Sequence, residues 1–513
     1  MATGTNKKIA KNTLFLYVRM LMTMGISIYT SRVVLAALGE TDFGIYNVVG
    51  GFVSMFSMIS GALSAATQRF LSFELGKKEN GRVSEIFSTA VMIHLLISLV
   101  ILALAETIGL WFVNEKMNFP EERYFAANWV YQFSVITFLI NIISVPYNAA
   151  LVAYERMKAF AYVSIIEVIL KLVVVYLLVL SPIDNLVFYA LLLSIIAIFI
   201  RLIYGIYVKK NFVQCRCTYK INREVGKQMF SFMGWNMFGA GAIVANGQGV
   251  NVLLNIFFGT TVNAARGIVF QVQGAVRGFI SNFQLAMAPQ IIKNYAANNY
   301  KEMFSLVFNG SRFSFLLMMN LALPIIMQAP FIMKLWLVKV PLYTVVFLRI
   351  VLITSMVDSL GQTLSYAMHA SGKVRNYQIV VGSSSLMVLP VVYLFLQEGC
   401  PPYYAFLVVL AFSFISLMLQ LIMLRLSINF PMICFLKEVF ARMFLVFFVA
   451  GIIPFLVNFL LVGNGWETFI LISIITVLCS VLSSLFIGLS LKERHILKMK
   501  VCNFIKKFYD NVY

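Results

Sequence analysis

The chain has 513 residues, of which 61% are hydrophobic and only 12% are charged. A soluble globular protein carries about 25% charged residues, so this composition excludes a water-soluble fold and requires that much of the apolar surface faces lipid. Lys and Arg number 40 against 20 Asp and Glu, which gives a formal net charge of +20. The basic residues lie between long apolar stretches rather than on one polar face, so we expect no nucleic-acid partner.

The six cysteines show neither a disulfide framework nor a metal-ligand pattern. Cys215 and Cys217 form a C-x-C pair, but no His and no third Cys lies nearby in the sequence. Because a structural zinc site needs four ligands, we expect no metal and no cofactor.

Fourteen apolar windows are long enough to cross a hydrocarbon core, which takes about 20 helical residues. The segments between them are too short for a soluble catalytic domain. The windows therefore predict an all-α polytopic membrane protein with about 14 transmembrane helices. They are 12–37, 43–67, 86–113, 125–151, 160–181, 186–208, 230–258, 264–289, 305–328, 342–368, 377–397, 403–425, 438–462 and 468–491.

The basic residues of the connecting segments are distributed very unequally. Segments on the side of the N-terminus hold 27 Lys and Arg residues, the opposite segments hold four, and nine lie inside the windows. Since cytoplasmic loops of membrane proteins are enriched in Lys and Arg, we expect both termini to be cytoplasmic. Trp111, Trp129, Trp336 and Trp466 fall near the predicted outer boundaries, where an aromatic belt would place them.

A weak internal repeat runs through the chain in register. Leu38-Gly39 joins the first two windows as Phe258-Gly259 joins the seventh and eighth, and Glu85-Ile86-Phe87-Ser88 corresponds to Glu302-Met303-Phe304-Ser305. The repeat predicts two six-helix bundles related by a pseudo-two-fold axis along the membrane normal, followed by two appended helices, a plan typical of alternating-access transporters. The expected parts are an N-terminal lobe 1–208, a basic linker 209–229, a C-terminal lobe 230–425, two helices within 438–491 and a basic tail 492–513.

Several basic residues lie deep inside the windows, where each costs about 2.5–3.5 kcal/mol on the lower insertion scales. At 100° per residue, Arg19 and Thr23 share a face with Asn12 and Thr30, while Arg266, Gln273, Arg277 and Gln284 share another. Two arginine-bearing faces indicate the walls of a hydrated cationic cleft. Helix packing through small and polar residues is the alternative, and it explains the glycines and serines better than the arginines. The candidate substrate-binding residues are Arg19, Thr23, Arg266, Gln273, Arg277, Gln284 and Arg312.

Acidic residues inside the windows are few. Glu167 and Lys171 are spaced i,i+4 and are expected to pair, whereas the partner of Asp358 must come from another helix. Ion coupling through Asp358, Glu167 or Lys171 is the alternative to structural pairing.

Five stretches, taken in their order along the chain, carry a resemblance to a known family. The chain resembles the Wzx-type polysaccharide repeat-unit flippases of the multidrug/oligosaccharidyl-lipid/polysaccharide exporter superfamily over nearly its whole length. Val338 stands where the family often has glycine, which affects only the geometry of that turn. The stretches are Leu38-Gly39 to Phe43-Gly44-Ile45-Tyr46, Gln68-Arg69-Phe70-Leu71-Ser72, Pro146-Tyr147-Asn148-Ala149-Ala150 with Tyr154-Glu155-Arg156, Leu335-Trp336-Leu337 with Val340-Pro341, and Ser371-Gly372-Lys373.

The resemblance implies a non-enzymatic transporter that flips undecaprenyl-pyrophosphate-linked oligosaccharide from the cytoplasmic to the outer leaflet for surface polysaccharide such as O-antigen or capsule. It implies a cationic cavity, which by position falls on Arg19, Arg277 and Arg312. A lipid II flippase is the alternative, and a drug or cation antiporter is a more remote one because Arg19 would repel cations. A membrane enzyme is disfavoured by the absence of a large outer loop. The nucleotide-binding loop G-x4-G-K-[ST] is also absent, so we expect that ATP does not drive the protein directly.

The same resemblance implies the partners and the location. We expect a monomer in the bacterial cytoplasmic (inner) membrane. Its partners would be the polyprenyl-pyrophosphate-linked oligosaccharide, membrane lipids and the polysaccharide polymerase machinery.

Overall fold

The fold is described from a computed structural model of the chain. Residues 216–221 of the basic linker, with Cys217, the side chain of Arg32, and the basic tail beyond residue 494 lie outside the described residues. The structure describes residues 2–54, 57–77, 82–115, 117, 119–178, 181, 184–215, 222–337, 340–460, 465–490 and 493–494.

Every regular element in the described ranges is a helix. This is what lipid demands, because a helix satisfies its backbone hydrogen bonds internally where no water is available. The chain divides into two compact units. The six-helix lobes expected from the repeat stay a prediction. Unit 1 comprises Met1–Ala242, Leu285–Met303 and Tyr366–Gly382, and unit 2 comprises Ile243–Gln284, Phe304–Ser365 and Ser383–Tyr513.

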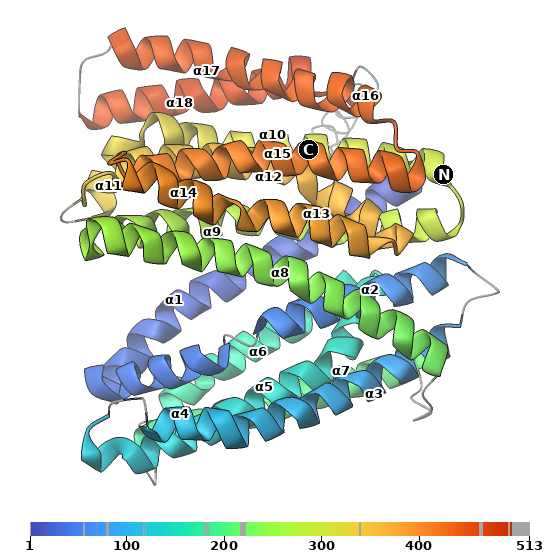
Figure 1. The fold of residues 1–513 in the computed structure, drawn as a ribbon, viewed down its shortest axis with the longest axis vertical. Coiled ribbons are helices and arrows are strands. Elements are labelled where there is room, and N and C mark those ends of the chain that lie inside the picture. Colours follow the sequence, from blue (N-terminus) through green and yellow to red (C-terminus); the bar gives the residue numbers. More distant parts are fainter. Residues whose placement is uncertain are drawn as a thin grey trace, which may run out of the picture. The chain divides into compact units, whose positions relative to one another are not determined.

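Helix α5 is central to unit 1, since it packs against α1, α2, α3 and α7 (Figure 1). Tyr131 and Ile142 of α5 and Phe87 of α3 are among its fully buried side chains. A π-helical turn (Ala105–Gly109) joins α3 to α4. The helices wholly within unit 1 are α1 (Ala2–Ser54), α2 (Ser57–Gly76), α3 (Val83–Leu104), α4 (Leu110–Glu115), α5 (Tyr124–Ala153), α6 (Met157–Leu177) and α7 (Asn185–Asn211), with 3-10 turns at Glu121–Arg123 and Val213–Cys215.

Five helices contribute residues to both units. They are α8 (Arg223–Phe258), α9 (Thr260–Ala296), α10 (Tyr300–Met327), α12 (Thr344–Ser371) and α13 (Val374–Leu386). Unit 2 further contains α11 (Ala329–Trp336), α14 (Val388–Gln397), α15 (Tyr403–Ile428), α16 (Met432–Phe435), α17 (Arg442–Leu460) and α18 (Trp466–Ser483), with π-helical turns at Leu436–Ala441 and Ser484–Gly488.

Pro390 divides one predicted span. The window 377–397 is occupied by two helices, α13 and α14, which are separated at Met387. A proline removes the hydrogen bond to the carbonyl four residues earlier and collides with it, and that carbonyl belongs to Leu386, the last residue of α13. Pro390 therefore accounts for the break between α13 and α14.

Eleven helical segments of the described residues are long and apolar enough to cross a membrane. Each of them falls on one of the fourteen windows. The other three windows, 12–37, 43–67 and 264–289, lie on α1, α2 and α9. Two of these windows contain the arginine-bearing faces predicted to line the cleft. The all-helical membrane fold is confirmed, while the count of fourteen spans stays a prediction.

Helix α17 shows what the membrane-facing surface looks like. Phe459 and Leu460 are each 75% exposed, and Phe444, Phe448 and Phe455 are also exposed. An apolar face of this extent would not be stable against water, and it fits the hydrocarbon core of a bilayer.

The two glycines of the internal repeat adopt the same backbone conformation. Gly39 interrupts α1 with φ 77° and ψ 172°, and Gly259, between α8 and α9, has φ 76°. Residues with a Cβ rarely adopt such angles. The repeat thus reflects a shared helix-breaking geometry, in which the chain needs glycine to begin the next helix.

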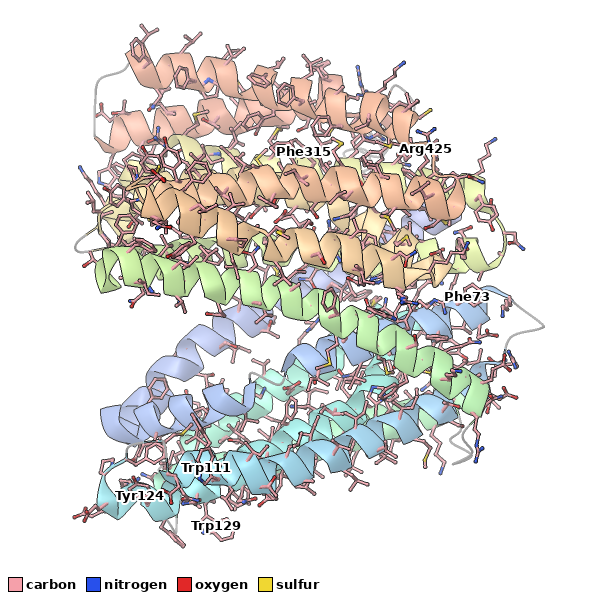
Figure 2. All side chains as sticks on the ribbon, viewed as in Figure 1. Phe73, Trp111, Tyr124, Trp129, Phe315 and Arg425 are labelled. Carbon is pink, nitrogen blue, oxygen red and sulfur yellow. The ribbon has the colours of Figure 1, made fainter. Side chains whose placement is uncertain are left out.

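An ionic network joins three segments of unit 1 at the end predicted to face outward. Arg123 donates from Nη1 to Asp184 at 2.6 Å and from Nε to Asp42 at 2.8 Å. Asp184 also caps α7, accepting from the N–H of Leu186 and Val187. Trp111 and Trp129 lie at this end of unit 1, and Phe73 lies at the other end (Figure 2).

The repeat glycines generate a stability prediction. Replacing Gly39 or Gly259 with Ala forces a Cβ into a conformation reserved for glycine, at a cost of roughly 1–3 kcal/mol each. No other atom lies within 4 Å of the added Cβ at either site, so backbone strain alone acts. We expect both variants to melt at a lower temperature in detergent. Gly25→Ala, in a regular and uncrowded turn of α1, should not be destabilised; equal losses at all three positions would contradict the account.

The outer network generates a pH prediction. Partial burial works to raise the pKa of Asp184, but hydrogen bonds from Arg123 and the α7 N-terminus outweigh it and hold this pKa below its usual 3.8. A lowered folded-state pKa stabilises fully above the unfolded value, and this stabilisation is lost as the pH falls through the folded value. The carboxylate is 37% exposed, so the effect is below about 1 kcal/mol.

The measurement is the melting temperature between pH 6 and pH 3. Asp184→Asn keeps an N-cap side chain but removes the charge, so its melting temperature should fall less steeply with acidification than that of the parent. Parallel curves for the two proteins would show that Asp184 contributes nothing.

Candidate functional site

The predicted site residues are divided between the two units. Arg19 and Thr23, with Glu167 and Lys171, lie in unit 1, and the remaining candidates lie in unit 2. We therefore describe two polar groups, one for each unit.

Arg19 is the cation of the first group. It lies on α1, partly buried, with its guanidinium 4.5 Å from the centre of the Phe160 ring on α6. Its Nε is buried without a hydrogen-bond partner. Glu167 and Tyr204 are near enough to act on its charge, but among the described residues no carboxylate lies within ion-pair distance of Arg19. An aromatic face attracts a cation without consuming its hydrogen bonds, so this guanidinium keeps donors for an incoming anion.

The acidic residue of the first group is paired as its spacing predicts. Lys171 donates to Glu167 at 2.6 Å along α6. Both side chains are partly exposed, so their charges reach the surface of the helix rather than being sealed inside it. Thr23 is less available, because its hydroxyl donates to the carbonyl of Met20 in its own helix at 3.0 Å.

Arg277 is the most accessible cation of the second group. It lies near the middle of α9, its side chain is 52% exposed, and its Nη2 is 3.4 Å from Asp358 on α12. Asp358 accepts a shorter hydrogen bond, 2.8 Å, from Ser413 on α15. Asp358 therefore has partners on two other helices, α9 and α15, where one was expected from the sequence. Arg277 makes the longer of the two contacts to Asp358. Since a guanidinium has five N–H donors, this one contact leaves other donors of Arg277 free.

The two glutamines on the arginine-bearing face of α9 are engaged in helix packing. Gln273 is buried and donates to Ser355 at 2.7 Å. Gln284 is also buried and donates to Ser314 and to the carbonyl of Ser359. These contacts correspond to the packing alternative, and the substrate-binding role of both glutamines stays a prediction.

Arg266 is held by the preceding helix. It donates to Asn251 at 3.1 Å and to the carbonyl of Gly247 at 2.7 Å, and it lies over the Phe270 ring at 4.2 Å. These contacts engage both Nη groups with protein oxygens, whereas Nε is buried without a hydrogen-bond partner. Its role in binding substrate also stays a prediction.

Arg312 has an acidic partner that sequence reasoning missed. The guanidinium, 9% exposed, pairs with Glu493 just beyond the last helix, and it also donates to Asn309 at 2.9 Å. Glu493 accepts from the N–H and hydroxyl of Ser490. The S-x-x-E spacing signals a helix start, but no sequence pattern connects residues 181 positions apart. Of the three predicted cavity arginines, Arg277 and Arg312 both have a carboxylate partner, and Arg312 is much the more buried of the two.

A further arginine of unit 1 lies on an aromatic ring. The guanidinium of Arg201 on α7 stacks 3.7 Å from the centre of the Tyr147 ring, and its Nε is buried without a partner. A Cβ on Gly205 would come within 2.8 Å of Arg201, so the glycine leaves room for this side chain. Tyr147 belongs to one of the motif stretches, which was the available signal.

The family of the chain is shown by its sequence. A sequence pattern described as "Polysaccharide biosynthesis protein" matches residues 9–299, more than half of the chain. The chain belongs to this family. No curated protein sequence matches the chain.

Solved structures establish the fold of this polysaccharide biosynthesis protein. An outward-facing multidrug resistance MATE transporter of the MOP superfamily aligns with a TM-score of 0.73 at 11% identity, covering 83% of this chain and 96% of that one. A MOP superfamily transporter from Pyrococcus furiosus aligns at 0.69 and 11%, with the same coverage. The MATE transporter ClbM, in complex with Rb+, aligns at 0.70 and 15%, covering 84% and 98%.

At these identities the likeness shows the fold alone. The protein has the MATE-like fold of two helical bundles, and it is a multi-pass membrane protein of a polysaccharide biosynthesis family. The resemblance found from the motifs is confirmed for the polysaccharide biosynthesis family and for the fold, while Wzx-type specificity stays a prediction.

The Arg312–Glu493 pair generates a prediction. Removing one partner of a fully buried pair costs about 3–5 kcal/mol, and this pair should cost less because the Glu493 side chain left behind is 23% exposed. Arg312→Ala should therefore melt well below the parent in detergent. The double variant Arg312→Met with Glu493→Leu should recover most of the loss, because both charges are gone. A single variant as stable as the parent would show that the pair does not form.

Proposed function

We propose that the protein flips a polyprenyl-pyrophosphate-linked oligosaccharide from the cytoplasmic to the outer leaflet by alternating access. The observation that carries the proposal is the sign and availability of the intramembrane charges. Arg277 is half exposed with its counter-ion 3.4 Å away, and Arg19 lies on an aromatic ring with no carboxylate within ion-pair distance among the described residues. Guanidinium groups bind phosphate oxygens bidentately, and the pyrophosphate supplies the matching anion.

The family and the lipid geometry support the same substrate class. The matching family is one of polysaccharide biosynthesis, and the motif resemblance implies sugars that are carried on lipids. A polyprenyl tail can remain in the bilayer while the charged head crosses between helical bundles. This division of the substrate requires a polar path only for the head group.

The charges argue against cation transport by the route of the multidrug relatives. The Pyrococcus furiosus transporter is described as having a binding pocket of reverse polarity that suggests a different function. We infer a comparable reversal here, because Arg19 and Arg277 would repel a cationic drug. Lipid II carries the same pyrophosphate and is the competing substrate within this class.

The two acidic residues have a defined place in this proposal. Glu167 and Asp358 act as counter-ions that hold Lys171 and Arg277 until the substrate phosphate displaces them. Displacement is feasible because the Arg277–Asp358 contact is long and Ser413 remains to satisfy Asp358. Ion coupling through Asp358, Glu167 or Lys171 is the competing role.

The test reconstitutes the purified protein in vesicles with a fluorescent polyprenyl-pyrophosphate oligosaccharide. Arg277→Ala should slow its appearance in the opposite leaflet by roughly 10–100-fold, since one charged hydrogen-bond pair of about 1.5–3 kcal/mol is lost. Lys334→Ala, which removes an exposed lysine from α11, should flip at the parental rate.

Asp358→Asn separates the two roles of the carboxylate. If Asp358 is only a counter-ion, the variant should flip at least as fast as the parent, because Arg277 is released. Loss of a proton or sodium dependence in this variant would instead establish coupling. Unimpaired flipping by Arg277→Ala would refute the proposed site, and preference for lipid II over the oligosaccharide lipid would select the competing substrate.

A further inference from the structure

Glu155 occupies an unusual backbone position in unit 1. It lies in the turn between α5 and α6 with φ 59°, the left-handed conformation that glycine ordinarily takes at the end of a helix. The turn is closed by hydrogen bonds from the N–H of Glu155 to Val152 and of Arg156 to Leu151. A glutamate at this position costs stability that glycine would not, so its side chain must contribute something in return.

The carboxylate of Glu155 is buried among donors from two distant segments. Its side chain is 2% exposed and accepts from Lys293 at 2.5 Å and from Gln290 at 2.5 Å, both near the end of α9. Lys8 near the start of α1 is 2.9 Å away. Burial works to raise the pKa of Glu155, but Lys293 and Lys8 outweigh it and keep this pKa below its ordinary value. The carboxylate is thus held in its charged form.

A second contact in unit 1 joins other distant segments. Arg69 on α2 donates to the carbonyls of His369 and Ala370 at the end of α12, at 3.0 and 3.2 Å. Its guanidinium lies over the rings of Phe70 and Phe73, at 4.5 and 4.8 Å. A Cβ on Gly372 would come within 2.6 Å of this guanidinium. A cation at the end of a helix is favoured by the helix dipole.

These contacts gather motif stretches that substrate binding does not use. Arg69, Glu155 and Gly372 belong to the stretches that carry the family resemblance, and they lie between spans on the side predicted to be cytoplasmic. The contacts of Glu155 with Lys293 and Gln290, and those of Arg69 with α12, join the predicted lobe 1–208 to the predicted lobe 230–425, whereas the Lys8 contact lies within the first lobe. In any state that admits a head group between those lobes from the cytoplasm, these contacts must be broken.

We propose that Glu155 is the receiver of an ionic latch, in which Lys293 and Gln290 of α9 close the cytoplasmic entrance, and that the latch releases when substrate enters. The inference rests on the proposed function, which requires such an entrance. Release is feasible at this place. The lysines are 22% and 52% exposed, so water can solvate the separated charges, whereas ions separated in mid-membrane would remain unsolvated.

The test measures the distance between spin labels at Lys158→Cys on α6 and Asn299→Cys beyond α9, both exposed positions, after replacement of the six native cysteines. The parent should show a narrow, latched population. Glu155→Ala should raise the ratio of the wider to the narrow population about tenfold or more, because charged hydrogen bonds are lost. The charge exchange Glu155→Lys with Lys293→Glu should restore the narrow population.

Lys301→Ala, which removes an exposed lysine at the start of α10, is the matched control and should resemble the parent. If Glu155→Ala does not fold, Glu155→Gln is measured in its place. An unchanged distance distribution in the variant that folds, or failure of both variants to fold, would overturn the latch. The readout is a conformation, so a protein that unlatches normally but moves no pyrophosphate lipid would refute the proposed function and leave the latch intact.

Discussion

A charged group inside a bilayer must find a protein partner or a wet cavity, and this constraint organises the polar chemistry of the protein. Arg266 and Arg349 are held by carbonyls or amides of neighbouring helices, and Arg442 donates to two carbonyls at the end of the π-helical turn after α18. Arg312 forms an ion pair with the carboxylate of Glu493. The protein contacts of these arginines support the fold, although the Nε atoms of Arg266 and Arg312 are buried without a hydrogen-bond partner.

Arg19 and Arg277 differ from this group in the quality of their partners. Arg19 lies on an aromatic face. Arg277 is 3.4 Å from Asp358, which also accepts a hydrogen bond from Ser413. Weakly compensated cations at depth are costly, and function is the usual reason for keeping them. An anion with a lipid tail is the ligand that such an arrangement would recognise.

The parts of the structure that follow from local sequence were predictable. Apolar windows predicted the helices, i,i+4 spacing predicted the Glu167–Lys171 pair, and the repeat located Gly39 and Gly259, whose φ angles agree within a degree. Which helices face one another was not predictable, because a single sequence gives a periodicity but no partner. The substrate-binding role of Gln273 and Gln284 stays a prediction, and their hydrogen bonds to α10 and α12 were not indicated by any sequence pattern.

Long-range pairs show the same limit more sharply. Glu155 meets Lys293 across 138 residues, and Arg312 meets Glu493 across 181. In each case one partner lies in a turn or just beyond the last span, where hydropathy carries no signal. The motif Tyr154-Glu155-Arg156 marked the position, but its partners emerged only from the packing of unit 1.

The sign of the charge on the preferred ligand tests the central claim most directly. Equilibrium binding to the purified protein would be compared for undecaprenyl pyrophosphate and for a cationic amphiphile of similar chain length, each at low and high salt. The account predicts that the pyrophosphate binds, that salt weakens its binding, and that removal of Arg277 abolishes most of it. Tight binding of the cation with none of the pyrophosphate would contradict the account.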